Sequence, residues 1–348
     1  MAVEYSIENQ KTNAQFYAAE DQTILDSALR ANEWLPHSCT QGTCGTCKIR
    51  VLQGEVAHNA SPEYTLTAEE RDTGLALACT ASACSNLVIE PVDQTDDAAP
   101  HHPLRDYHGT VVALDDIATG TRRLLIELDE PMKFNAGQYC ALDIPGTPIS
   151  RHYSMANPPS QDQLLEFHVR LTPGGAATAG WIFSSLQPGQ KVALRGPLGQ
   201  FNCFEPRQES TILVGGGTGL APLKSIVLHA LEHDLLPEIY LYHGGRTQQD
   251  LYDVEFFEGL SEKYDHFHYR PALSEEQWSG AHGLITDAVL EDFATCRGMA
   301  GYICGPPPMV TAAVKAFKRR RMSPRLIFRE EFTPTGGNPL PHSTNSPS

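Results

Sequence analysis

Four cysteines of the chain have the spacing of a metal-cluster site. Cys39, Cys44 and Cys47 form C-x4-C-x2-C, and 31 residues separate Cys47 from Cys79. Three thiolates on one short loop can wrap a compact cluster, and a distant fourth thiolate can close the cage. This is the spacing of plant-type 2Fe-2S clusters, and we expect one here. A structural zinc site is the alternative, but it usually has two C-x2-C-like pairs, and only Cys44 and Cys47 form one.

The other isolated cysteines fit no ligand spacing. We expect Cys84, Cys140, Cys203 and Cys296 to be small buried hydrophobic residues. Nine cysteines are an odd number, and the first ten residues, MAVEYSIENQ, have neither the basic nor the apolar region of a secretory signal. Metal or redox use is therefore favoured over disulfides, and a cytoplasmic location is expected.

A cation, an aromatic ring and a hydroxyl lie together in Arg151-His-Tyr-Ser154. Arg151 can bind a pyrophosphate, Tyr153 can pack on a ring system, and Ser154 can hydrogen-bond its polar edge. Downstream, in GGAAT, Gly175 and Thr178 would present free N–H groups to an anion at a helix start. The two segments together predict a flavin nucleotide site. An ordinary strand end and an ordinary capped helix are the alternatives.

Two glycine-containing segments near the C-terminus each join a predicted strand to a helix. VGGGTGLAP contains Gly215, Gly216, Gly217, Thr218 and Gly219, and YICGPPPM contains Cys304, Gly305 and Pro306. Neither is G-x-G-x-x-G or a Walker loop. Glycines still allow the backbone to approach a phosphate, and the helix N-terminus favours the anion. Because both follow parallel strands, they predict a dinucleotide site, although each alone could be a tight turn.

The nucleotide preference depends on the segment after the strand expected at 239–243, where the adenosine ribose should lie. A 2′-phosphate usually needs several cations, but only Arg246 is available, and Asp250 lies nearby. We expect NADH to be preferred, although Arg246 could permit some use of NADPH.

The elements that must position these residues divide the chain into five segments. Residues 1–96 alternate short apolar runs with turns, and residues 97–104 form a polar linker. Residues 105–207 show short alternating runs separated by Gly and Pro, which predicts an antiparallel barrel. Residues 208–332 alternate strands with helices, which predicts a parallel sheet. Residues 333–348 are rich in Pro, Ser and Gly, which predicts a disordered tail.

Apolar patterns within these segments predict individual elements. In the C-terminal segment we expect strands at 211–214, 239–243, 267–271 and 302–304, and helices at 221–232, 253–263, 285–293 and 310–320. In the barrel we expect strands at 109–114, 123–128, 138–144, 165–171 and 191–195. His101 and His102, in the linker, are expected to be solvated.

Charge limits the partners of the chain. Its 348 residues carry a net charge of −16, which argues against nucleic acid and anionic membrane surfaces as partners. Residues 1–96 hold 14 acids and 5 bases, net −9, and the other 252 residues hold 28 and 21, net −7. This uneven distribution suggests that the first segment is a separate domain with its own partner. No apolar run reaches the roughly 18 residues that a membrane helix needs.

Residues 1–332 resemble the reductase components of bacterial soluble diiron multicomponent monooxygenases. C-x4-C-x2-C, R-x-Y-S-x-A-N-P, G-G-G-T-G-L-A-P and C-G-P-P-P-M match in order. The phenol, methane and small-alkane enzymes are the most similar branch, and the propane 2-monooxygenase reductases are the specific expectation. The resemblance implies a β-grasp 2Fe-2S ferredoxin domain, an antiparallel β-barrel FAD domain, and an α/β parallel-sheet NAD-binding domain like that of ferredoxin–NADP reductase. Electrons would pass from NADH through FAD and the cluster to a diiron hydroxylase.

The same resemblance implies roles for individual residues. Cys39 and Cys44 would hold one iron, and Cys47 and Cys79 the other. Arg151, Tyr153 and Ser154 would bind FAD, with Thr178 near its pyrophosphate; Gly215 to Gly219 would take the NADH pyrophosphate. Tyr153, Ser154 and Cys304 are the catalytic candidates, with Cys304 near the nicotinamide ring. Phe332 falls where the family ends on an aromatic ring over the flavin, although this chain continues for 16 more residues.

Oxygen activation is expected on another polypeptide. A diiron site needs two Glu-x-x-His motifs on helices, and the only one noted, Glu55 to His58, lies in a predicted strand–turn region. The expected partners are therefore a diiron hydroxylase and the small coupling protein of its system. The reductase of a Rieske-type ring dioxygenase is the nearest alternative. A non-catalytic iron–sulfur redox sensor is an alternative of another class.

Overall fold

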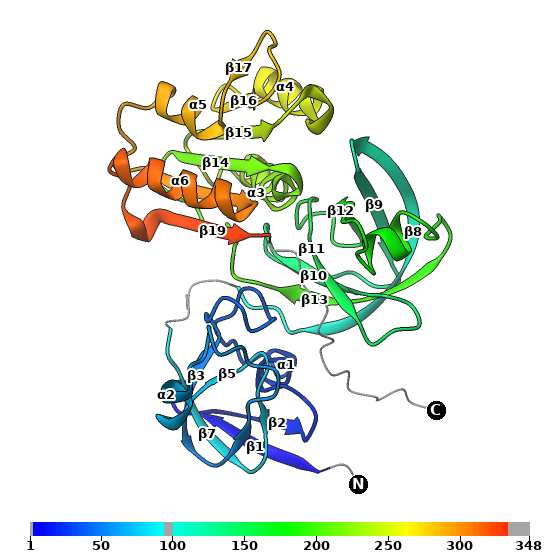
Figure 1. Ribbon diagram of the computed structural model, residues 1–348, viewed down its shortest axis with the longest axis vertical. Coiled ribbons are helices and arrows are strands. Elements are labelled where there is room, and N and C mark those ends of the chain that lie inside the picture. The colour runs from blue at the N-terminus through cyan, green and yellow to red at the C-terminus, as the bar shows by residue number, and fades with distance from the viewer. Residues whose placement is uncertain (1–2, 94–99, 333–348) are drawn as a thin grey trace.

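The computed structural model describes residues 3–93 and 100–332, which form three sheet-based domains (Figure 1). The N-terminal domain is built on a five-stranded sheet of order β2-β1-β7-β3-β5, in which β1 is parallel to β7 and antiparallel to β2. Its strands are β1 (Glu4–Asn9), β2 (Ala14–Ala19), β3 (Lys48–Gln53), β5 (Leu75–Leu77) and β7 (Leu87–Pro91). The short strands β4 (Val56–Ala57) and β6 (Ser82–Ala83) pair separately.

Two helices complete the N-terminal domain. The helix α1 (Ile24–Arg30) begins at Thr23, whose side chain accepts a hydrogen bond from the Asp26 N–H, and it buries Ile24, Leu25 and Leu29. The helix α2 (Ala68–Asp72) starts with a capping box between Thr67 and Glu70. The cysteine loop, residues 39–47, lies between α1 and β3 and has no regular structure, as the sequence predicts.

The middle domain is the predicted antiparallel barrel. Its sheet order is β11-β10-β13-β8-β9-β12, and an isolated bridge between Met155 and Phe167 links its two ends. Its strands are β8 (Arg105–Ala118), β9 (Thr121–Leu128), β10 (Tyr139–Asp143), β11 (Ser150–Ser154), β12 (Leu164–Arg170) and β13 (Lys191–Leu198). A single π-helical turn, η1, covers Thr178–Ile182. The sequence did not predict β11: it is short, and its middle residues are polar.

The C-terminal domain has a fully parallel sheet of order β17-β16-β15-β14-β18-β19. The strands are β14 (Thr211–Gly216), β15 (Ile239–Gly245), β16 (Phe267–Leu273), β17 (Ala281–His282), β18 (Ala300–Gly305) and β19 (Ile327–Glu331). The helices are α3 (Leu220–His233), α4 (Val254–Lys263), α5 (Ile285–Asp292) and α6 (Pro307–Arg319). One apolar core contains residues of α3 and α4 and another contains residues of α5 and α6, so both faces of the sheet are covered.

The N-terminal domain packs against the barrel, and the end of the predicted linker takes part in that contact. Leu104 and three barrel residues, Tyr139, Ala141 and Leu198, belong to the same apolar cluster as the core of the N-terminal domain. His101 is not simply solvated, because its ring stacks on Trp34 with 4.6 Å between centroids. Burial of apolar surface, which charge counting does not show, thus joins the two domains.

Two further expectations lie partly or wholly outside the described residues: the predicted tail at 333–348 and the start of the linker. Cys84 is exposed, contrary to expectation, whereas Cys140, Cys203 and Cys296 are buried as predicted. Among the helices that the structure describes, none is long and apolar enough to cross a membrane.

Candidate functional site

A cleft of about 1260 Å³ lies where the three domains meet, and most predicted site residues line it. They are Cys39, Cys44, Arg151, Tyr153, Ser154, Gly175, Thr178, Gly216, Gly217, Thr218, Arg246, Pro306 and Phe332. Single ligand sites usually occupy about 300–1,000 Å³, so this cleft has room for more than one ligand. The cysteine loop, the Arg151-His-Tyr-Ser154 strand and both glycine loops, far apart in the sequence, therefore share one space.

The four predicted metal ligands lie in two pairs, Cys39 with Cys44 and Cys47 with Cys79. The Sγ atoms of Cys47 and Cys79 are 3.2 Å apart. The Cys39 sulfur accepts hydrogen bonds from the N–H groups of Gln41 and Thr43, both at 3.4 Å. A hydrogen bond from the Cys44 thiol is the main reason that the pKa of Cys39 is lowered to about 5. Two pairs of thiols with N–H donors aimed at sulfur are a donor set that fits a 2Fe-2S cluster.

Glycines allow the cysteine loop to turn. Gly42 and Gly45 have φ values of +77° and +79°, in the left-handed region that side chains disfavour. A Cβ on Gly42 would also lie 3.1 Å from Pro62 and from Thr80. Thr40, which does have a Cβ, adopts φ of +50° in the same loop, so its backbone is strained.

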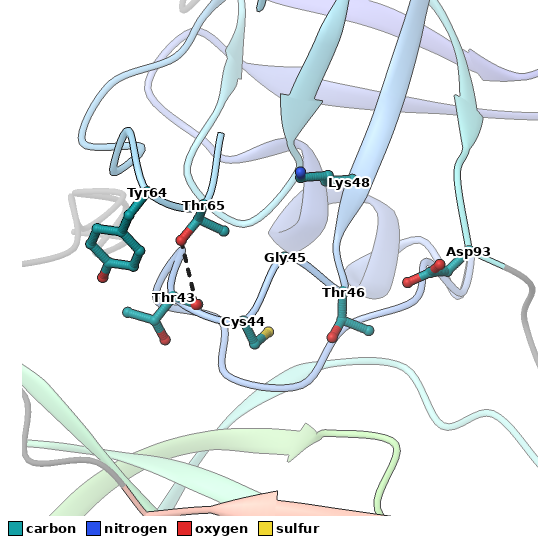
Figure 2. A pocket seen from close by; sticks show the side chains of 8 residues that line it. All are labelled: Thr43, Cys44, Gly45, Thr46, Lys48, Tyr64, Thr65 and Asp93. Carbon is teal, nitrogen blue, oxygen red and sulfur yellow. Dashed lines mark hydrogen bonds between the residues drawn. The ribbon is translucent and has the colours of Figure 1, made fainter. Parts of the chain in front are cut away.

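The outer side of the cysteine loop borders a second, shallower depression of about 320 Å³ (Figure 2). Its lining includes Cys44, Lys48, Asp93 and the exposed ring of Tyr64, and the Thr65 hydroxyl donates to the Thr43 carbonyl at its edge. Cys44 lines both this depression and the central cleft. Cys44 is therefore accessible both from the cleft and from this depression.

The predicted flavin residues lie on one side of the cleft. Arg151 and Tyr153 are partly buried on β11, and Ser154 is 5% exposed at its end. The Thr178 hydroxyl accepts from the Thr172 N–H and donates to the Thr172 carbonyl, both at 3.1 Å, which closes the loop before η1. Gly175 lies inside this loop, where a Cβ would come within 2.7 Å of the Thr178 hydroxyl. Open space bordered by a cation, an aromatic ring and a glycine loop fits a flavin nucleotide.

The two glycine loops of the C-terminal domain touch one another at the carboxyl ends of β14 and β18. Gly215 and Gly216 are the last residues of β14, and a 3₁₀ turn, Gly217–Gly219, leads into α3. A Cβ on Gly219 would lie 2.2 Å from the Cys304 carbonyl oxygen. Gly305 has φ of +149°, and a Cβ there would lie 3.0 Å from the Gly216 oxygen. Only glycine allows the loops to approach this closely.

Cys304 does not reach the cleft in this structure. Its side chain is 0% exposed and packs in the apolar core on the α3 side of the sheet. Burial raises the pKa of its thiol well above the ordinary value, so the sulfur is a neutral thiol. Three of the predicted glycines also do not line the cleft but lie next to residues that do: Gly215, Gly219 and Gly305. Phe332 does line the cleft, and its N–H donates to the Gly305 carbonyl at 2.9 Å.

The sequence analysis missed Glu330, which lines the cleft beside Phe332. Its Oε2 atom is out of contact with solvent and has no hydrogen-bond partner among the described residues. Burial raises the pKa of this carboxyl to about 8, so it is largely protonated at neutral pH. The residue lies on β19, a strand that was not predicted, and no spacing pattern marked it.

A buried ion-pair network that the sequence also did not reveal joins the barrel to the C-terminal domain. The Lys224 ammonium donates to Glu166 at 2.9 Å and to Asp253 at 2.8 Å, and Arg123 pairs with the same two carboxylates. Next to it, His168 Nδ1 lies 3.1 Å from the Tyr252 hydroxyl, which also lies 3.1 Å from the Gly217 carbonyl. These contacts fix the first glycine loop relative to the barrel.

Comparison with known proteins assigns a binding function to each domain. Residues 7–84 match the 2Fe-2S iron–sulfur cluster binding domain, residues 108–203 the oxidoreductase FAD-binding domain, and residues 213–315 the oxidoreductase NAD-binding domain. These matches and the geometry above agree with the cofactors predicted from the sequence: a 2Fe-2S cluster, FAD and a nicotinamide dinucleotide.

Full-length relatives are named as reductases of oxygenase systems. The chain is 49% identical over 317 residues to the reductase subunit of an aromatic O-demethylase from Amycolatopsis sp., covering 90% of this chain and 94% of the relative. It is 40% identical over 333 residues to the reductase component of phenol 2-monooxygenase from Pseudomonas sp., covering 94% of each. The crystal structure of an Amycolatopsis cytochrome P450 reductase superposes with a TM-score of 0.89 at 47% identity, covering 95% of this chain and 99% of that one.

Relatives named for the more specific expectations are less similar. The reductase component of propane 2-monooxygenase from Gordonia sp. is 32% identical over 342 residues, covering 96% of this chain and 98% of the relative. A reductase component of a naphthalene 1,2-dioxygenase system from Pseudomonas putida is 36% identical over 308 residues, covering 87% and 90%. The specific expectation of a propane-type reductase is therefore not favoured over the aromatic systems.

Proposed function

Because the chain belongs to the reductase components of multicomponent oxygenase systems, we propose that it supplies electrons to a cytochrome P450 of the aromatic O-demethylase kind. The observation that supports this partner is the 49% identity to an aromatic O-demethylase reductase subunit, together with the 0.89 TM-score against a cytochrome P450 reductase. The oxygenase itself is a separate polypeptide.

We assign the cofactors to the residues that line the cleft or stand directly behind it. The thiols of Cys39 and Cys44 would hold one iron, and those of Cys47 and Cys79 would hold the other, as their contacts in pairs favour. Arg151, Tyr153 and Ser154 bind FAD, with Gly175 and Thr178 shaping the loop at its pyrophosphate. Gly215 to Gly219 and Gly305-Pro306 receive the NADH pyrophosphate, and Arg246 lies at the adenosine end.

The shared cleft explains how one chain converts two-electron chemistry into one-electron chemistry. FAD supplies this conversion, since it accepts a hydride from NADH and releases electrons singly. The protein would orient the participants in one space: the glycine loops would bind the nucleotide, and the strand that carries Tyr153 and Ser154 lines the same cleft as the cysteine loop. Phe332, which lines the cleft, would pack against the flavin ring. Cys304 supports the glycine loop from the core.

Reconstitution tests the proposed partner. The purified reductase is mixed with an aromatic O-demethylase cytochrome P450, a methoxyaromatic substrate, NADH and air. One NADH and one O₂ should yield one phenol, one formaldehyde and one water per turnover. Because residues 1–96 carry a net charge of −9, transfer to the oxygenase should fall steeply as salt rises, whereas reduction of a neutral dye should barely change. Rapid ferricyanide reduction without any product would contradict the partner and leave the reductase activity intact.

A diiron hydroxylase with its small coupling protein is the second candidate partner. The motif resemblance points to it, and the 40% identity to a phenol 2-monooxygenase reductase component supports it. Parallel reconstitutions with a phenol-type and a propane-type diiron system distinguish the candidates, since product should form in one arm at a much higher rate per reductase. A Rieske-type dioxygenase forms a fourth arm, beside the cytochrome P450 and the two diiron systems.

A further inference from the structure

We propose that His152 is the positioning residue that fixes the cysteine loop on the flavin-site strand, and so sets the separation between the flavin and the cluster. The inference rests on the cofactor residues assigned above, but it concerns a residue to which neither the motif nor the comparisons give a role. His152 lies between Arg151 and Tyr153 on β11.

The register of the strands shows which way His152 faces. On β11, Arg151 and Tyr153 pair with Leu142 and Cys140, which belong to the core of the barrel. His152 instead pairs with Ala141, which belongs to the apolar core shared with the N-terminal domain. Neighbouring residues of a strand alternate between its two faces. One face of β11 therefore packs in the barrel core, and the other faces the N-terminal domain.

Hydrogen bonds then join His152 to the cysteine loop. The Gln41 side-chain amide lies 3.1 Å from Nδ1, and the Thr40 hydroxyl lies 3.3 Å from Nε2. Burial lowers the pKa of His152 to about 3, so the ring is neutral. A neutral ring with Nδ1 accepting from Gln41 carries its hydrogen on Nε2 and donates it to Thr40. Both ring nitrogens of His152 therefore form hydrogen bonds with residues of the cysteine loop.

Tyr139, on the neighbouring strand β10, makes further contacts with the cysteine loop. Its ring packs on His152 with 4.9 Å between centroids, and its hydroxyl donates to the Ser38 carbonyl at 2.5 Å. The same hydroxyl lies 3.2 Å from the Thr40 hydroxyl. Thr40 therefore has two barrel partners where its backbone adopts a strained positive φ. The residues on either side of Cys39 are held directly against the flavin-site strands.

The test uses the holoprotein and two readouts. Hydrogen exchange of the backbone amides at 38–44 reports how firmly the loop is seated, independently of activity. Stopped-flow absorbance after mixing with NADH separates flavin reduction from cluster reduction. His152→Leu removes both hydrogen bonds while filling the space. We expect loop exchange about five- to tenfold faster, as for loss of one or two ordinary hydrogen bonds, and cluster reduction slowed several-fold, with flavin reduction unchanged.

Three further variants decide the interpretation. His152→Asn keeps an acceptor for Gln41 and should restore part of both effects. Gln41→Met breaks the same contact from the loop side and should reproduce them even if His152→Leu folds poorly. Asp106→Asn removes a different contact between these domains, the pair with Arg30 at 2.8 Å, and should change neither readout.

Two results would overturn the proposal. One is wild-type loop exchange and cluster reduction in both His152→Leu and Gln41→Met. The other is an equal effect of Asp106→Asn, which would mean that general loosening of the domain contact is responsible. Absence of iron or flavin from the wild-type protein would instead contradict the cofactor assignment, and the hydrogen-exchange comparison would still report on His152.

Discussion

The backbones of Gly219 and Cys304 are in close contact: a Cβ on Gly219 would come within 2.2 Å of the Cys304 carbonyl oxygen. This contact holds the two glycine loops together at the ends of β14 and β18. The thiol of Cys304 packs on the other side, in the core. The pair therefore fixes the shape of the proposed nucleotide site although neither residue lines the cleft.

Gly219→Ala should push the two loops apart. Overpacking of this kind costs about 1–3 kcal/mol of stability, and the proposed pyrophosphate site should lose its shape. We expect the KM for NADH to rise at least several-fold while bound FAD is retained. Gly259→Ala is the matched control, because nothing lies within 4 Å of a Cβ at this helical position. An unchanged KM in Gly219→Ala would contradict this account of the loop contact.

Cys44→Ser should lose the iron–sulfur absorption and the iron, because it removes one of four ligands. Since Cys44 is exposed and lies on the loop rather than in the shared core, bound FAD and NADH-dependent ferricyanide reduction should remain. Metal analysis and visible spectra check the first part, and dye assays the second. Cys84→Ser, at an exposed cysteine outside the ligand set, should keep the cluster. Release of FAD from Cys44→Ser would show that the loop supports the flavin site.

Arg151→Ala should weaken FAD binding. The lost charge-assisted hydrogen bonds to a pyrophosphate are worth about 1.5–3 kcal/mol, or roughly 10- to 100-fold in the dissociation constant. Flavin fluorescence after dilution measures the released FAD. Arg325→Ala, at an exposed residue of the C-terminal domain, is the control. Full FAD occupancy of the Arg151 variant after dilution would remove this residue from the flavin site.

The preference for NADH should depend on Asp250. Its carboxylate lies 3.3 Å from the Arg246 guanidinium and accepts hydrogen bonds from the Arg246 and Thr247 N–H groups at 3.2 Å. The Asp250 carboxylate therefore pairs with Arg246, the one cation predicted to bind a 2′-phosphate, and its negative charge repels that phosphate. Asp250→Asn keeps the shape of the loop but removes the charge, so kcat/KM for NADPH should rise several-fold while that for NADH changes little. Equal kcat/KM values for both nucleotides in the wild type would contradict the predicted preference.

Glu330 should make the stability of the flavin-free protein fall as pH rises. Its pKa is about 8 in the folded protein, against an ordinary value of 4.5. Between these values the folded protein binds a proton that the unfolded chain has lost, so the free energy of unfolding decreases with pH. Glu330→Gln removes this contribution, and its melting temperature should exceed that of the wild type by more at pH 8 than at pH 5. Glu331→Gln, the exposed neighbour, is the control, and parallel pH profiles for Glu330→Gln and the wild type would contradict the assignment.

The sequence predicted those parts of the fold and site that depend on local pattern. The helix expected at 221–232 is α3 (Leu220–His233), and that expected at 285–293 is α5 (Ile285–Asp292), because their apolar spacing and flanking glycines act locally. The cysteine spacing likewise identified four thiols that the fold brings together. The short polar strand β11 and the last strand, β19, were missed because pairing with other strands, not their own composition, makes them strands.

Contacts between domains could not be predicted in the same way. The sequence assigned no role to His152, the second residue of the predicted flavin motif. It also did not distinguish Glu330 from the other acidic residues near the C-terminus. Their roles depend on their surroundings: the Gln41 amide lies beside His152, and the Oε2 atom of Glu330 has no hydrogen-bond partner among residues 3–93 and 100–332. Cys304 shows the converse, because the motif places it near the nicotinamide ring, whereas the sequence alone did not show that its side chain is buried in the core.

The apolar cluster that includes Tyr139, Ala141 and Leu198 limits how such a chain can be recombined. A chimera joined at the linker would acquire a foreign N-terminal cassette but keep the barrel half of a contact shaped for the original one. The residues that decide compatibility lie on β10 and β13, more than 30 positions beyond the junction. To exchange the N-terminal domain without losing this contact, two separate segments must be exchanged: the domain itself and the contacting residues of β10 and β13. A crossover placed only at the domain boundary would separate residues that pack against each other.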